Sequence, residues 1–517
     1  MNEMKLTTEQ YEAVKLFHSG GNLVVNAFAG TGKTTTAIAI AESTTANGLY
    51  LAFNRSISDE IKIRYRQLNL DCRTTHSLAC RYIRSKTKYT DDKLFKDSPI
   101  NFLVSEAGLK DVDIAETLPL KARSFAFLLM ETIKAFCASG LQEIAVKHVP
   151  KYGMLSTLDK ATFEELQKYV VSYAAYIWNE MRREDSNYRL GHDGYLKLWS
   201  LASPDLPYKF ILLDEAQDTN DAVLSVLQKS SNRVVYIGDR YQQIYSWRGA
   251  INAMSKVGDA NFTTLSQSFR FGDSIADLAN HILERFGETE NIQGNPIVKT
   301  SINNVIARSV ICRSNAGVLT SVVAQLSRSK KVYVMGGVSE LRILLDDVSY
   351  LKSARPATNS IFFGFKDWKE VCEFADSEDG KHLQSFVRVI GSFGEDKLKQ
   401  ALDACVTNEA EAEIVVTTAH KAKGREWDTT EIHSDFLSSW LRAPGRLDDE
   451  QSEEEARLLY VAITRCKYGL VISDELLSLI RRERFSTLTN PVEAPPQVSS
   501  TEVNRRPTPP SFIRERR

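Results

Sequence analysis

The sequence predicts an α/β fold with two parallel-sheet domains, each with an insertion, of which the first is expected to be all-helical. Strands alternate with helices up to about residue 85 and again from Phe210 to Phe271, a pattern typical of a doubly wound parallel sheet. Between these stretches helical periodicity dominates and no strong strand is evident. The strand–helix alternation returns near Asn304 and predicts a second sheet.

Each domain is expected to be assembled from two segments of the chain. The boundaries that we expect are 1–85 with 201–275 for the first domain, 86–200 for its helical insertion, 276–350 with 410–485 for the second domain, and 351–409 for its reduced insertion. Residues 486–517 are rich in proline and arginine, cannot bury a core and are predicted to be disordered. A solvated tail is the simpler interpretation of this segment, although weak contact with nucleic acid or a partner stays open.

The overall composition excludes several classes of protein. A chain of 517 residues is too long for one core, and its net charge of −1 means that any nucleic-acid surface must be local. The seven cysteines form no CxxC pair, so neither a zinc site nor a disulfide framework is indicated. No apolar run reaches membrane-spanning length and no signal-peptide pattern is present. We therefore expect a cytoplasmic protein with no membrane partner.

A phosphate-binding motif lies between Asn22 and Ala41. An apolar run that predicts a buried strand is followed by a glycine turn and then by good helix formers. In such a motif backbone N–H groups surround phosphate oxygens, a lysine reaches the β- and γ-phosphates, and a hydroxyl ligates Mg²⁺. Ala27 stands where the usual pattern begins with glycine. The residues that we expect to bind the nucleotide here are Ala29, Gly30, Thr31, Gly32, Lys33, Thr34 and Thr35.

Two carboxylates follow the apolar run that resumes at Phe210. Asp214 and Glu215 come at the carboxyl end of that predicted strand, and ligands of open α/β sheets bind at this edge. Asp214 is therefore expected to hold Mg²⁺ together with Thr34, and Glu215 to accept a proton from an attacking water. The alternative is that Asp214 and Glu215 are solvated acids of a surface turn, and the phosphate motif upstream argues against it.

A second dense stretch, GDRYQQIYSWRGA, follows the predicted strand at 233–238. Gln242 is expected to orient a water or to contact a γ-phosphate. Tyr245 and Trp247 lie two positions apart beside Arg248, and aromatic rings next to a cation suit the stacking of nucleic-acid bases. Trp247 as an ordinary core residue is the alternative.

The order of these motifs resembles superfamily 1A DNA helicases of the UvrD/Rep type. The series GTGKT, TTHS, DEAQD, GDRYQQIYSWRGA, SFRF, TTAHKAKGREWD and EEARLLYVAITR extends over nearly the whole chain. The segments AFNRSI and HDGYLKLWSL are most similar to the F-box DNA helicase branch. No F-box precedes the helicase motifs in this sequence, and we expect a prokaryotic, phage or trimmed relative. The resemblance implies two RecA-like domains.

The resemblance also implies roles for individual residues. Gln10 would read adenine and Glu426 would contact the ribose, while Lys33, Asp214, Glu215 and Gln242 keep the roles given above. Arg270 and Arg465 would stabilise charge on the transferred phosphoryl group. The positions that match DNA-contacting residues of the family are Phe53, His76, Tyr245, Trp247 and His420.

Three departures from the family pattern stand out. Phe269 replaces the family's tyrosine, which leaves adenine stacking possible. Arg425 replaces a leucine, with no consequence that the sequence indicates. The second insertion is much shorter than that of UvrD, so regulation attributed to it in the family is not carried over.

The resemblance implies an ATP-dependent DNA helicase or translocase that moves 3′→5′ on single-stranded DNA. Its cofactors would be ATP and Mg²⁺, bound in a cleft between the two domains. Its partners would be single-stranded DNA and single-strand/duplex junctions, and the protein would be nucleoid-associated in a prokaryote or nuclear in a eukaryote. Two alternatives stay open: an ATPase that remodels recombinase filaments, and a motor subunit of a larger nuclease or defence complex.

Overall fold

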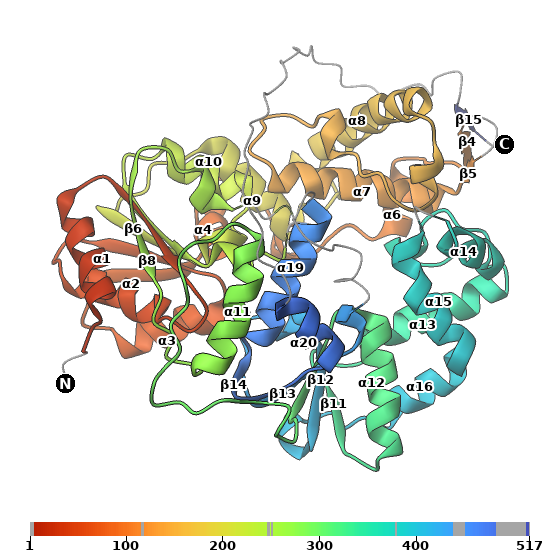
Figure 1. The fold of residues 1–517 in the computed structure, drawn as a ribbon. Coiled ribbons are helices and arrows are strands. Elements are labelled where there is room, and N and C mark those ends of the chain that lie inside the picture. Colours follow the sequence, from red (N-terminus) through yellow and green to blue (C-terminus); the bar gives the residue numbers. More distant parts are fainter. Residues whose placement is uncertain are drawn as a thin grey trace.

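Two parallel sheets of six strands each organise the chain (Figure 1). The computed structural model describes residues 5–114, 118–245, 249, 252–377, 380–437, 450–481 and 513–515. The predicted α/β fold with two sheet domains is confirmed, while the residue boundaries of the domains stay a prediction. No helix within the described ranges is long and apolar enough to cross a membrane.

The first sheet has the strand order β3-β2-β6-β7-β1-β8, and all of its neighbours pair in parallel. Its strands are β1 (Asn22–Ala27), β2 (Gly48–Ala52), β3 (Leu70–Thr74), β6 (Phe210–Asp214), β7 (Arg233–Gly238) and β8 (Ala260–Leu265). Leu23 and Val25 of β1 pack into one core and Val24 into another, because successive side chains of a strand point to opposite faces. Because all strands of this sheet are parallel, their carboxyl ends lie at the same edge, and motifs that are distant in the sequence meet there.

Several helices pack against the strands of the first sheet. They are α1 (Thr8–Ser19), α2 (Lys33–Glu42), α3 (Arg55–Arg64), α4 (Thr75–Lys86) and α10 (Asp221–Lys229). Thr7 caps α1 and forms a capping box with Gln10, and Thr74 caps α4 through the Ser77 N–H. These caps satisfy N–H groups that have no partner within the helix.

The first insertion shares a hydrophobic core with one face of the first sheet. Its helices are α5 (Asp91–Phe95), α6 (Ile100–Glu106), α7 (Ala122–Ala138), α8 (Lys160–Arg182) and α9 (Gly191–Ala202). The expectation that this insertion is all-helical needs correction, because β4 (Val112–Ile114) and β5 (Leu118–Leu120) form an antiparallel pair within it. Strands of three residues leave too short an alternation to be read from the sequence.

The predicted disordered tail contains one strand. Residues Ile513–Glu515 form β15, which pairs antiparallel with β4. The prediction of disorder is therefore wrong for these three residues, and the rest of 486–517 lies outside the residues that the structure describes. The edge of β4 supplies the backbone partners that an isolated tail segment lacks.

The second sheet has the strand order β11-β12-β10-β13-β14-β9, again entirely parallel. Its strands are β9 (Ser301–Ile302), β10 (Ser309–Cys312), β11 (Val332–Val334), β12 (Ile414–Thr418), β13 (Trp427–Ile432) and β14 (Cys466–Val471). Its helices are α11 (Asp273–Arg285), α12 (Asn315–Ser327), α13 (Ser339–Lys352), α17 (Ala419–Ala422), α19 (Glu450–Ile463) and α20 (Asp474–Arg481). In Figure 1, α19 lies between the two halves of the molecule.

The second insertion is helical and small. Its helices α14 (Trp368–Ala375), α15 (Lys381–Phe393) and α16 (Glu395–Asp403) pack into the same core as α12 and α13. Phe363, in the loop before α14, packs into the core of the first insertion instead of this core, and 5% of the residue is exposed. The two insertions are therefore in direct contact.

Candidate functional site

The predicted phosphate motif lies between β1 and α2 with the geometry that its glycines require. Gly30 and Gly32 have φ angles of +77° and +83°, a region that favours glycine. A Cβ atom on Gly30 would lie 2.6 Å from the Ser268 hydroxyl and 2.7 Å from the Arg270 Cβ. Lys33, Thr34 and Thr35 form the first turn of α2, and the Thr31 hydroxyl donates to the Phe28 carbonyl oxygen (2.8 Å).

The two predicted carboxylates lie at the same edge of the sheet, at the end of β6. Asp214 is the last residue of that strand, and Glu215 follows in the left-handed conformation with φ of +50°. A non-glycine residue in this region is strained, and such strain is often found at functional sites. The backbone N–H of Glu215 donates to Asp214 Oδ1 (2.9 Å), which fixes the Asp214 side chain relative to the backbone of Glu215.

Thr34 and Asp214, the two residues predicted to hold Mg²⁺, converge on one hydroxyl group. Tyr50 donates to Asp214 Oδ2 (2.7 Å), and the Thr34 side chain lies near the same hydroxyl. Burial and then the Glu215 charge raise the pKa of Asp214. A carboxylate oxygen and a hydroxyl oxygen that lie close together suit a hard divalent ion.

Glu215 is held in its ionised form by neighbouring lysines. Burial by itself would raise the pKa of Glu215, but the positive charges of Lys33 and Lys423 outweigh it and hold that pKa below its usual range. The Gln217 side chain donates to Glu215 Oε2 (2.5 Å) and accepts from the Asp239 N–H (3.1 Å). Sequence reasoning missed Gln217, although its place inside DEAQD was a usable signal.

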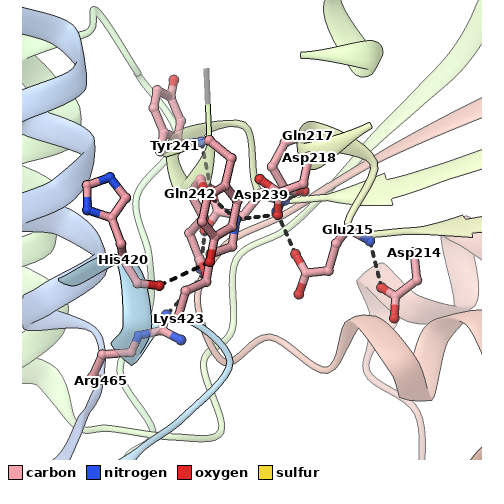
Figure 2. A network of polar contacts seen from close by, with 11 residues as sticks. Asp214, Glu215, Gln217, Asp218, Asp239, Tyr241, Gln242, His420, Lys423 and Arg465 are labelled. Atoms are coloured by element: carbon pink, nitrogen blue, oxygen red, sulfur yellow. Dashed lines mark hydrogen bonds and ion pairs between the residues drawn. The ribbon is translucent and has the colours of Figure 1, made fainter. Parts of the chain in front are cut away.

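Gln242 connects the first sheet to Arg465 from the second (Figure 2). Its Nε2 donates to Asp239 Oδ2 (2.8 Å) and its Oε1 accepts from Arg465 Nη2 (3.2 Å). Arg465 is 2% exposed, and burial followed by the charge of Arg270 lowers the pKa of Arg465 to about 9. The structure thus brings two predicted catalytic residues from different sheets into contact.

A buried ion pair also joins the two sheets. Lys423, which follows α17, contacts Asp218 of the DEAQD motif and the backbone carbonyl oxygen of Gln242. The side chains of Lys423 and Asp218 are 7% and 1% exposed. Burial raises the pKa of Asp218 to about 6 against the opposing charge of Lys423. Sequence reasoning missed this pair, because 205 positions separate its members.

Arg270 and Glu426 form a second link. Arg270 Nε donates to Glu426 Oε2 (2.7 Å), and Arg270 Nη1 donates to the Thr464 carbonyl oxygen (3.0 Å). Lys467 also pairs with Glu426 (2.8 Å). The predicted ribose residue and both predicted arginines therefore belong to one cluster around the end of α19.

Gln10 presents an unused donor beside the phosphate motif. Its Oε1 accepts from the Thr7 N–H (3.0 Å), while its buried Nε2 has no partner among the described residues. A Cβ atom on Gly32 would lie 2.9 Å from that Nε2 and 3.5 Å from the Phe269 ring, and Phe269 is 49% exposed. An orphaned amide and a free aromatic face suit a planar base with hydrogen-bonding atoms.

Three of the predicted DNA residues form an aromatic shelf, which we define as Phe53, Tyr245 and His420. The rings of Phe53 and Tyr245 stack at 6.2 Å, and Tyr245 donates to the His420 carbonyl oxygen (3.0 Å). Burial, then Arg313, lowers the pKa of His420 to about 4. Trp247 lies outside the residues that the structure describes.

His76 lies apart from the shelf, at a basic pocket where α4 meets the first insertion. The cavity has a volume of about 610 Å³. Its charged and aromatic lining residues are Arg73, His76, Arg81, Arg84, Phe95, His192 and Tyr195. The Arg84 guanidinium lies over the Phe95 ring, 5.2 Å from its centroid. Sequence reasoning found His76 but missed the arginines, because Arg73 comes from β3 and Arg81 and Arg84 come from α4, and they form no motif.

Comparison with known families matches both halves of the chain. Residues 6–259 match the UvrD/REP helicase N-terminal domain, and residues 364–475 match the UvrD-like helicase C-terminal domain. The chain belongs to the UvrD-like helicase family. The predicted resemblance is thereby confirmed.

Individual relatives agree with this assignment. This UvrD-like helicase is 30% identical to F-box DNA helicase 1 of Gallus gallus over 93% of the chain and 50% of the relative. It is 28% identical to F-box DNA helicase protein 1 of Schizosaccharomyces pombe over 93% of the chain and 59% of the relative. It is also 32% identical to ATP-dependent DNA helicase PcrA of Leuconostoc citreum over 19% of the chain and 15% of the relative. The chain spans about half the length of the first two relatives.

Proposed function

We propose that this UvrD-like helicase hydrolyses ATP between its two sheets and uses the cycle to move 3′→5′ along single-stranded DNA. The observation that carries the proposal is the meeting of residues from both sheets at one point. Lys33, Asp214 and Glu215 come from the first sheet, and Arg465 from the second contacts Gln242 beside them (3.2 Å). Proteins that couple nucleotide hydrolysis to movement complete their site from two bodies that shift relative to each other.

The nucleotide is proposed to be ATP with Mg²⁺. When bound, ATP would supply the phosphoanhydride bond that is cleaved, and Mg²⁺ would supply positive charge to the phosphate oxygens. Gln10 and Phe269 would hold the base, and the N–H groups of the loop from Ala29 to Gly32 with Lys33 would hold the phosphates. Thr34 and Asp214 would hold the metal ion.

The chain's own groups are suited to hydrolysis. Glu215 is ionised, and Gln217 fixes one of its carboxylate oxygens, so the other can accept a proton from water. Gln242 would orient that water. Arg465 and Arg270 would place positive charge on the opposite side, and such arginines are worth about 10³–10⁵ in rate.

The DNA path is proposed to cross the aromatic shelf and to reach the basic pocket. Phe53 and His76 follow β2 and β3, which pair in parallel, so both residues lie at the carboxyl edge of the first sheet. Rings would stack on bases at about 1–3 kcal/mol each. Arg81 and Arg84 would contact phosphates, an interaction that weakens as salt rises.

The test is the rate of ATP hydrolysis with and without single-stranded DNA, with Lys33→Ala as the inactive control. The expected result is strong stimulation by DNA that Lys33→Ala abolishes. Duplexes with a 3′ or a 5′ single-stranded tail then test direction, and unwinding of the 3′-tailed duplex alone is expected. Hydrolysis that is indifferent to DNA, or unwinding from the 5′ tail, would contradict the proposal. Displacement of a bound recombinase without strand separation would favour filament remodelling.

A further inference from the structure

Tyr460 joins the phosphate loop to the second sheet through one buried hydroxyl group. It lies on α19 and is 0% exposed. Its hydroxyl accepts a hydrogen bond from the Ala29 N–H (3.2 Å) and donates one to Asp239 Oδ2 (2.9 Å). One side chain of the second sheet region therefore contacts two loops of the first.

Asp239 connects Tyr460 to the predicted catalytic residue Gln242. Asp239 is 0% exposed, and its Oδ2 accepts from both Tyr460 and Gln242 Nε2 (2.8 Å). Gln242 Oε1 in turn accepts from Arg465 Nη2, and Arg465 Nε donates to the Val461 carbonyl oxygen (3.0 Å). The hydrogen bonds form a circuit that leaves α19 at Tyr460 and returns to it at Val461, through Arg465.

The circuit lies out of contact with water, which makes each of its bonds costly to break. Burial raises the pKa of Asp239, while the charge of Lys33 and the hydrogen bonds from Gln242 and Tyr460 oppose that rise. A buried carboxylate that loses a donor is left with an unsatisfied acceptor, which costs free energy. Movement of Tyr460 therefore disturbs Asp239, and through it the orientation of Gln242 and Arg465.

We propose that Tyr460 is a positioning residue that makes the orientation of Gln242 and Arg465 depend on the phosphate loop. The Ala29 N–H belongs to the loop whose N–H groups would hold phosphate oxygens, so a phosphate and the Tyr460 hydroxyl compete for it. This inference rests on the proposed ATP hydrolysis and adds the link between phosphate binding and the arginine. The hydroxyl acts through Asp239 and Gln242 and needs no contact with the reacting atoms.

The test compares Tyr460→Phe with Tyr241→Phe, each of which removes only a phenolic hydroxyl. Tyr241 is a matched control, because it is also buried and donates to a carboxylate, Glu288 (2.8 Å), which lies outside the circuit. For Tyr460→Phe we expect kcat for ATP hydrolysis to fall at least about tenfold. Affinity for a non-hydrolysable ATP analogue, measured by isothermal calorimetry, should be unchanged or tighter, because the Ala29 N–H becomes free to serve a phosphate.

Tyr460→Phe should melt at a somewhat lower temperature than Tyr241→Phe, because it loses the bond from the Ala29 N–H as well as the bond to a carboxylate. A fall in kcat that is equal in both variants, or a fall that accompanies weaker analogue binding, would overturn the role of Tyr460. If Tyr460→Phe is unstable, Asp239→Asn breaks the same circuit one step later and should show the same split between kcat and affinity. If the wild type hydrolyses ATP but the variants do not show this split between kcat and affinity, only the role of Tyr460 is contradicted. A wild type without ATP hydrolysis counts against the proposed function as well.

Discussion

Two of the contacts between the halves of the molecule differ in their chemistry. The polar contact, which we define as Asp218, Asp239, Gln242, Lys423, Tyr460 and Arg465, is a buried network of charges and hydrogen bonds beside the phosphate loop. The apolar contact, defined as Phe127, Tyr152, Gly153, Met154 and Phe363, joins the two insertions. There the Phe363 ring lies 5.1 Å from that of Tyr152 and 6.3 Å from that of Phe127.

The apolar contact is closely fitted at Gly153 and Gly364, and a cavity of about 830 Å³ lined by Phe127 and Phe363 lies beside it. A Cβ atom on Gly153 would lie 2.8 Å from the Phe363 carbonyl oxygen, and one on Gly364 would lie 3.2 Å from the Met154 Cβ. Such a contact is stabilised by burial of apolar surface, which does not depend on a ligand's charge. The polar contact, in contrast, can exchange partners when an anion enters. We infer that the polar contact changes during the cycle while the apolar contact stays closed.

The largest effect is expected from Arg465→Ala, which breaks the polar contact at its catalytic end. The rate of ATP hydrolysis should fall by about 10³–10⁵, because charge on the transferred group loses its partner. Arg342→Ala is the matched control, since Arg342 forms an exposed ion pair with Asp403 on the same half. Steady-state hydrolysis measures both, and a loss below tenfold in Arg465→Ala would contradict this role.

Phe363→Ala is expected to break the apolar contact and to act on stability more than on chemistry. Truncation of a buried phenylalanine costs about 3–5 kcal/mol, and urea unfolding measures the loss. ATP hydrolysis per folded molecule should change less than twofold, because the residue lies in the insertions. A stable Phe363→Ala protein with impaired hydrolysis would show that the two contacts are not independent.

Asp218→Asn is expected to leave the Lys423 charge buried without a counter-charge. The predicted cost is again about 3–5 kcal/mol in the free energy of unfolding. The double variant Asp218→Leu with Lys423→Met should recover much of that stability, because it buries no unpaired charge. A double variant as unstable as the single one would mean that the contact depends on the ion pair itself.

The sequence predicted those features that local patterns encode. The phosphate loop and the strand that ends at Asp214 each occupy a short segment whose residues interact with one another. The contacts between the halves could not be predicted in this way, because Ala29 and Tyr460 are 431 positions apart. Phe363 lies in an irregular segment, and nothing in its neighbourhood distinguishes it from a core residue of the second insertion. The strands β4 and β5 were too short to show a period of two.

The smallest effect is expected from pH, through His420 at the aromatic shelf. Its folded-state pKa of about 4 lies below the unfolded value of about 6.5. Between these values the unfolded chain binds a proton that the folded protein excludes, so stability falls as pH drops through this window. The slope due to this residue is at most about 1.4 kcal/mol per pH unit. Urea unfolding at pH 7 and pH 5 should show a smaller difference for His420→Gln than for wild type, and equal differences would exclude this effect.

Hydrogen–deuterium exchange with and without a non-hydrolysable ATP analogue tests the difference between the two contacts most directly. The account predicts that the analogue changes exchange in peptides that contain Gln242, Lys423 and Arg465. Exchange in peptides that contain Tyr152 and Phe363 should stay the same. Equal changes at both contacts, or a change at the insertions alone, would contradict the claim that the nucleotide acts on the polar contact while the apolar contact holds the halves together.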